Sequence, residues 1–174
     1  MESDSIVVIA ELPGVHRIWA FHNLVVVVWT GKPTGDAASM IARVSDRLLA
    51  RGPATKLSYL HFVPNKLELP DAAARAGFVD LAHSQGARTG CVALILDGAG
   101  FWASAIRGFV TSIRVIAPRT IDLRIHSEMS ELLEWFPEEH AQRTGVQLES
   151  AELLRQLEHV RRNTPQSRAP EKTL

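Results

Sequence analysis

The chain has 174 residues, of which 46% are hydrophobic and 22% are charged, a balance typical of one globular domain of ordinary size. Its formal net charge is zero, so no global field would draw it to a nucleic-acid backbone or to an anionic membrane. The composition therefore predicts no nucleic-acid partner and no membrane insertion.

Cysteine usage and the N-terminal residues indicate a cellular compartment. Cys91 is the single cysteine, which excludes an intramolecular disulfide framework, and it lies in an apolar run where a buried thiol is expected. Glu2 and Asp4 stand where a secretory signal would carry positive charge, and the longest unbroken apolar stretch, residues 24–29, is too short to cross a bilayer. We expect a reducing, cytoplasmic location.

The first elements in chain order are strands. Residues 6–12 and 17–29 are apolar and β-branched, and His22-Asn23 is suited to a tight turn that would fold the second run into a hairpin. Thr34 can then cap a helix whose apolar residues recur at three- and four-residue spacing and which ends before Gly52.

Alternating strands and helices follow. Residues 57–63 are predicted to form a short strand, and Asp71 can cap a helix reaching about Gln85, which Gly86 closes. Residues 91–96 form a continuous apolar run, as in the buried strands of parallel sheets.

The helix predicted after Gly100 is strongly patterned, with an apolar stripe from Trp102 to Ile116, and Pro118 is predicted to stop it. A last strand at residues 121–125 leads to Ser127 as the cap of a short helix that ends near Pro137. Ser150 can cap an extra amphipathic helix.

This alternation predicts an α/β fold with a mostly parallel sheet of four to five strands, an N-terminal hairpin and covering helices. We expect residues 1–140 to form the α/β domain and residues 141–162 to add the amphipathic helix. Residues 163–174 are polar and lack a hydrophobic period, so we expect a disordered tail.

The order of elements over residues 6–136 resembles the STAS fold of anti-sigma-factor antagonists and of the cytosolic tails of sulfate transporters. The segments most similar to that family are residues 91–96 leading into 100–102, and residues 123–125 followed by 127–136. The resemblance implies a non-enzymatic regulatory or signalling module, bacterial in type, that binds a protein partner or a small ligand.

One departure from the family concerns its phosphorylated serine, which in members with a phospho-switch begins the helix after the third strand. Residues 63–71 contain no serine or threonine, so the resemblance does not extend to that switch. Asp71 could place a fixed negative charge at this helix start, although an ordinary N-cap explains an aspartate there better.

A turn at residues 97–100 is a candidate binding site, because ligands of α/β proteins lie between strand ends and helix N-termini. Asp97, Gly98 and Gly100 belong to this turn. The turn lacks the third glycine of a dinucleotide motif and the lysine of a P-loop, and a tight strand-to-helix connection needs glycine in any case.

No catalytic or metal site is expected, and no cofactor. The seven histidines are scattered without paired helical spacing, and no cysteine or carboxylate cluster completes a metal site. Ser104 and Ser112 lie within a helical pattern that does not expose a nucleophile.

Two helices carry the remaining candidates. Trp102 and its apolar neighbours could line a pocket for a lipid or small ligand, or could simply cover the sheet, and Arg107 could contact an acidic partner. Leu153, Leu154 and Leu157 in the extra helix could form a homodimer or partner interface, or could pack back on their own domain. The sequence favours a protein-binding module, with a small apolar-ligand or lipid-binding protein as the alternative.

Overall fold

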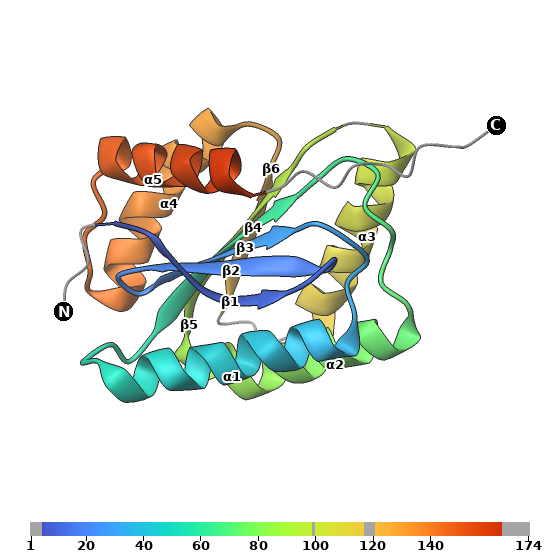
Figure 1. Cartoon of the computed structure of the whole chain (residues 1–174), viewed down its shortest axis with the longest axis horizontal. Helices are drawn as coiled ribbons and strands as arrows, with labels where there is room; N and C mark the ends of the chain where they lie inside the picture. The colour runs from blue at the N-terminus through green and yellow to red at the C-terminus, as the bar shows by residue number, and fades with distance from the viewer. Residues whose placement is uncertain (1–4, 99, 117–120, 165–174) are drawn as a thin grey trace.

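The computed structural model describes residues 5–98, 100–116 and 121–164, and Figure 1 shows the arrangement of their elements. Six strands form one sheet in sequence order, β1 to β6. The first three pair antiparallel, and β3 to β6 pair parallel. The α/β class is confirmed. The sheet has six strands, more than the four to five expected, because both N-terminal runs join it.

The N-terminal hairpin forms where the sequence predicts it. β1 (Val7–Leu12), β2 (His16–Phe21) and β3 (Leu24–Trp29) are consecutive, and Phe21 pairs with Leu24 across a two-residue turn. His22 opens this turn at a φ of 50°. All of β3 is buried, whereas β1 lies at an edge of the sheet.

The parallel strands are β4 (Leu57–Val63), β5 (Thr89–Leu96) and β6 (Asp122–His126). β5 begins two residues before the predicted strand and β6 is displaced by one. Because side chains alternate along a strand, β4 directs Tyr59 and Val63 to one face of the sheet and Leu60 and Phe62 to the other. The sheet thereby separates two hydrophobic clusters.

Three helices cover the first face: α1 (Gly35–Arg51), α2 (Ala72–Gln85) and α3 (Phe101–Ile116). Both predicted caps are confirmed. The Thr34 hydroxyl oxygen accepts a hydrogen bond from the backbone N–H of Ala37, and the Asp71 carboxylate accepts one from that of Ala74. A short 3-10 turn, Gly86–Arg88, follows α2. Pro118, the predicted stop of α3, lies outside the described residues.

Two helices cover the opposite face: α4 (Met129–Thr144) and α5 (Ser150–Asn163) (Figure 1). The prediction of a short helix capped by Ser127 is wrong. α4 continues through Pro137 to Gly145, whose φ of 76° ends it, and Glu128 occupies the N-cap. A proline removes one backbone hydrogen bond, and burial of Phe136 and His140 on either side of it holds both halves of α4 against the sheet.

α5 packs on its own chain. Leu153, Leu157 and Val160 are buried in one cluster with Phe136 of α4 and with the sheet. Of the two arrangements that the sequence left open, this is packing back on the domain. Asn163, expected in the tail, ends α5, and residues 165–174 lie outside the described part of the chain. No helix in the described ranges has the length and apolar character needed to cross a membrane.

Candidate functional site

A cavity of about 420 Å³ lies between the sheet and the helices α2 and α3. β3 to β6 form its floor, and α1 and the segment after β4 close its sides. Its lining residues come from all of these elements: Trp29, Pro33, Ile41, Tyr59, His61, Val63, Leu67, Pro70, Phe78, Leu81, Ala82, Gln85, Thr89, Val92, Leu94, Ile106, Phe109, Val110, Ile113, Ile121 and Leu123.

The cavity exists because α2 and α3 do not close over the sheet. α2 packs closely along α1 but approaches α3 at few positions. Phe78 of α2 and Phe109 of α3 meet edge to face, with ring centroids 6.4 Å apart. Phe78, Phe109 and Val92 pack against the buried core cluster of this face but remain only partly buried. The wall is therefore apolar and retains accessible surface.

His61 is the most informative polar group in this wall. The indole Nε1–H of Trp29 donates a hydrogen bond to His61 Nδ1 at 3.2 Å, and the two rings are nearly parallel, at 12°. A neutral imidazole that accepts at Nδ1 carries its proton on Nε2. Nε2 has no hydrogen-bond partner within the described ranges, so its N–H is a donor that the protein leaves unused.

Protein atoms surround His61 and hold it neutral. Burial, and to a smaller extent the nearby His16, lower its pKa to about 4. The ring nevertheless keeps some accessible surface, because part of it faces the cavity. His16 is itself buried beside Trp29, at 5.2 Å between ring centroids, and desolvation lowers its pKa to about 4. At neutral pH this end of the cavity therefore carries no charge.

Most polar side chains elsewhere in the cavity lining have hydrogen-bond partners within the protein. The Tyr59 hydroxyl donates to Ser45 Oγ at 2.9 Å, and desolvation raises the pKa of Tyr59. Thr89 donates through its hydroxyl to the backbone oxygen of Gln85. The Gln85 amide donates to Asp46, while its oxygen is buried and has no partner in the described part of the chain. Among the described residues, the lining contains no Asp, Glu, Lys or Arg.

The turn after β5 has a structural role in the described residues. Asp97 is exposed and its backbone N–H donates to Val63 O. Gly98 has a φ of 118°, and a Cβ there would lie 2.7 Å from the Asn65 side chain, so the position requires glycine. Gly100 has a φ of 80° and its carbonyl accepts from Ser104 of α3.

Trp102 does not line the cavity but fixes part of its wall. Its indole N–H donates to the backbone oxygen of Leu67 at 2.7 Å, and Leu67 is a lining residue. The expectation of a pocket beneath this helix corresponds to the observed cavity, although other α3 residues, such as Phe109 and Val110, form its wall.

The remaining sequence candidates lie apart from the cavity. Asp71 is an N-cap that also pairs with Lys32 at 3.1 Å, and the Ala74 N–H and the Lys32 ammonium hold its pKa below the usual value. Arg107 is exposed and donates to Ser127. In α5, Leu154 is partly accessible, whereas two other candidates are fully buried in their own domain: Leu153 and Leu157.

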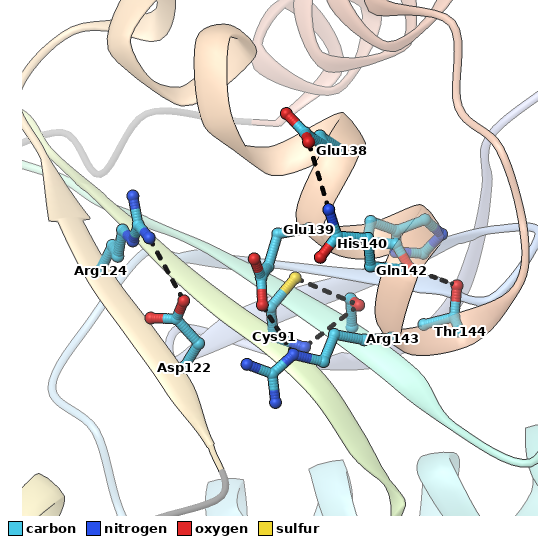
Figure 2. A network of polar contacts seen from close by, with 10 residues as sticks. Cys91, Asp122, Arg124, Glu138, Glu139, His140, Gln142, Arg143 and Thr144 are labelled. Carbon is cyan, nitrogen blue, oxygen red and sulfur yellow. Dashed lines mark hydrogen bonds and ion pairs between the residues drawn. The ribbon is translucent and has the colours of Figure 1, made fainter.

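A polar network surrounds Cys91 on the opposite face of the sheet, beneath α4 (Figure 2). The thiol lies 3.4 Å from Ser58 Oγ, and Arg143 pairs with Glu139 at 2.6 Å. Cys91 is buried, as expected, and burial raises the pKa of its thiol to about 12. It is therefore not a nucleophile at neutral pH. The described residues contain no group of three His, Cys, Asp or Glu side chains that could hold a metal ion.

Sequence reasoning missed the residues that make the cavity polar. Trp29 and His61 lie on neighbouring strands and are 32 positions apart in the chain, so no local spacing connects them. The available signal was a histidine two positions after Tyr59, and so on the same side of a mostly apolar strand. The register of β3 and β4 was needed to bring the indole to it.

No family model and no curated protein matches this chain. A solved structure is similar to it: that of an uncharacterized protein from the DUF3478 family with a SpoIIAA-like fold, from Shewanella loihica PV-4. The two share 15% identity at a TM-score of 0.48, over 75% of this chain and 93% of the other. The SpoIIAA-like description agrees with the STAS-like resemblance of the sequence. The likeness concerns the fold alone.

Proposed function

We propose that this chain is a non-enzymatic binding protein that holds a small, uncharged, mostly apolar molecule between α2, α3 and the sheet. One observation carries the proposal, the apolar cavity of about 420 Å³. Its size lies in the usual range for small-molecule sites, which are also lined by apolar and aromatic side chains with a few placed polar groups.

The apolar wall of the cavity supports an occupant. The cavity is open to solvent, and water in it would find few hydrogen-bond partners, because most of the lining is apolar. An apolar ligand that displaces this water removes apolar surface from solvent, which is worth roughly 25 cal/mol per Å².

The protein-binding role favoured by the sequence stays a prediction. The fold is compatible with a regulatory module of that kind. Of the leucines expected at an interface, Leu154 alone keeps accessible surface, since Leu153 and Leu157 are in the core. A protein partner, a homodimer and a cytoplasmic location are likewise predictions, and native mass spectrometry reports oligomeric state and retained small molecules together.

A dye titration with a matched pair of variants tests the cavity. N-phenyl-1-naphthylamine is an uncharged dye that fluoresces in apolar surroundings, and we expect it to bind the parent protein. Val92→Phe extends a ring into the cavity from β5, and should weaken dye binding at least about tenfold by filling the space. Val115→Phe makes the same change at an exposed position of α3, where 81% of the residue is accessible, and should leave binding unchanged.

Two results would contradict the proposed function. The first is a parent protein that shows no saturable dye binding. The second is equal loss of binding in Val92→Phe and Val115→Phe, which would place the dye outside the cavity. Circular dichroism of both variants shows that each remains folded.

A further inference from the structure

The polar end of the cavity is arranged to donate one hydrogen bond. The Trp29 Nε1–H donates a hydrogen bond to His61 Nδ1 at 3.2 Å, which fixes the proton of the neutral imidazole on Nε2. The two hydroxyl donors elsewhere in the lining are already used: Tyr59 donates to Ser45, and Thr89 donates to the Gln85 carbonyl. His61 Nε2–H has no acceptor among the residues described, and the ring lines the cavity.

We propose that His61 selects the ligand by donating this hydrogen bond, so that the cavity takes an uncharged apolar molecule bearing one acceptor oxygen, such as a ketone. This inference rests on the proposed function and adds the chemical class of the ligand. Trp29 is a positioning residue for this hydrogen bond, because its indole N–H sets the tautomer and orientation of His61.

The uncharged lining of the described part of the chain narrows the chemical class of the ligand further. Its described residues offer a carboxylate ligand no Lys or Arg to pair with, and burial of an unpaired carboxylate is costly. Burial lowers the pKa of His61 to about 4, so the ring does not supply a positive charge at neutral pH. A carbonyl or ether oxygen needs only a neutral donor, which His61 Nε2–H provides.

The experiment compares two probes with the same ring system on the full-length protein. Naphthalene has no acceptor oxygen, and 2-acetylnaphthalene adds a ketone. Their affinities are measured by displacement of N-phenyl-1-naphthylamine from the parent, from His61→Phe and from His61→Gln. Phenylalanine keeps a ring but removes the donor, whereas glutamine keeps an N–H donor.

In the parent, the ratio of ketone to naphthalene affinity should exceed that of His61→Phe by about five- to tenfold, the usual value of one hydrogen bond. His61→Gln should restore part of the ratio. Naphthalene affinity should be similar in all three proteins, which shows that the cavity persists. The carbonyl stretch of bound 2-acetylnaphthalene should lie at lower wavenumber in the parent than in His61→Phe, a difference that a purely structural role for His61 would not produce.

The outcomes separate the two proposals. If both probes bind but the ratio and the carbonyl stretch are the same in the parent and His61→Phe, the role of His61 is overturned and the cavity remains a binding site. If His61→Phe loses naphthalene and ketone affinity equally, His61 supports the wall and does not select the ligand. If neither probe binds the parent, the proposed function fails, and this inference fails with it.

Discussion

His140 in α4 is a fully buried histidine that makes no hydrogen bond through its ring. It stacks on Phe136, with ring centroids 5.7 Å apart at 21°. Burial, and then the nearby His22, lower its pKa to about 4. His16 is in the same condition on the other face of the sheet, with neither ring nitrogen bonded. Both rings act as apolar filling as long as they stay neutral.

These histidines should make the fold sensitive to mild acid. Between pH 6.5 and about 4, the unfolded chain binds a proton at His140 that the folded chain does not, so the free energy of unfolding falls as the pH is lowered. The slope is at most about 1.4 kcal/mol per pH unit for one histidine. Urea denaturation at a series of pH values should show His140→Leu to be less destabilised by acid than the parent.

The matched control is His83→Leu, at an exposed position of α2, where the same change removes no buried ring. At neutral pH, His140→Leu should cost little, because no hydrogen bond is lost. If the free energy of unfolding fell equally with pH in His140→Leu and in the parent, His140 would bind its proton as readily in the folded chain as in the unfolded chain.

At the scale of elements, two of the predicted N-caps are confirmed, since they depend on local chemistry, whereas Ser127 is not the cap of α4. Thr34 and Asp71 begin α1 and α2 as expected, because a side-chain oxygen satisfies an N–H of the first turn whatever the helix later contacts. A pocket beneath α3 was one of the two alternatives for its apolar stripe, but the lining of the cavity could not be predicted. The lining depends on the separation of α2 and α3 over the sheet, which no residue of either helix encodes alone.

The length of α4 could not be predicted either, because the helix was expected to end near Pro137. Pro137 is the ninth residue of the helix, and its missing N–H leaves the carbonyl of residue 133 without its usual partner. Pro137→Ala should therefore raise the free energy of unfolding by about 1–3 kcal/mol, since it restores that bond and removes the steric conflict. Thermal and urea denaturation measure the change.

A second proline variant supplies the comparison. Pro64 lies in the turn after β4, where its carbonyl accepts from Leu67 and no helix is interrupted. Pro64→Ala should leave stability unchanged or lower it slightly, through the greater freedom of the unfolded chain. A similar loss in Pro137→Ala would mean that the helix does not run continuously through this residue.

At the scale of the whole molecule, the sheet needs a cover on both faces, and α5 completes the second cover. Leu153, Leu157 and Val160 contribute to the cluster that includes Trp19 and Phe21 of the hairpin. Further contacts tie α5 to the N-terminal strands: Gln156 accepts from the backbone N–H of Ile6 at 3.0 Å, and Trp19 meets His159 edge to face. The last helix therefore stabilises the first strands.

Because α5 packs on its own chain, its contribution to the free energy of unfolding should not depend on dimer formation. Leu157→Ala should lower the free energy of unfolding by about 2–5 kcal/mol, because it opens a cavity in the core, whereas Leu154→Ala, at a partly accessible position, should cost much less. The loss in Leu157→Ala should be the same over a hundredfold range of protein concentration. If the loss shrank with increasing concentration, α5 would instead be buried against a second copy of the chain, since the stability of a dimer depends on concentration.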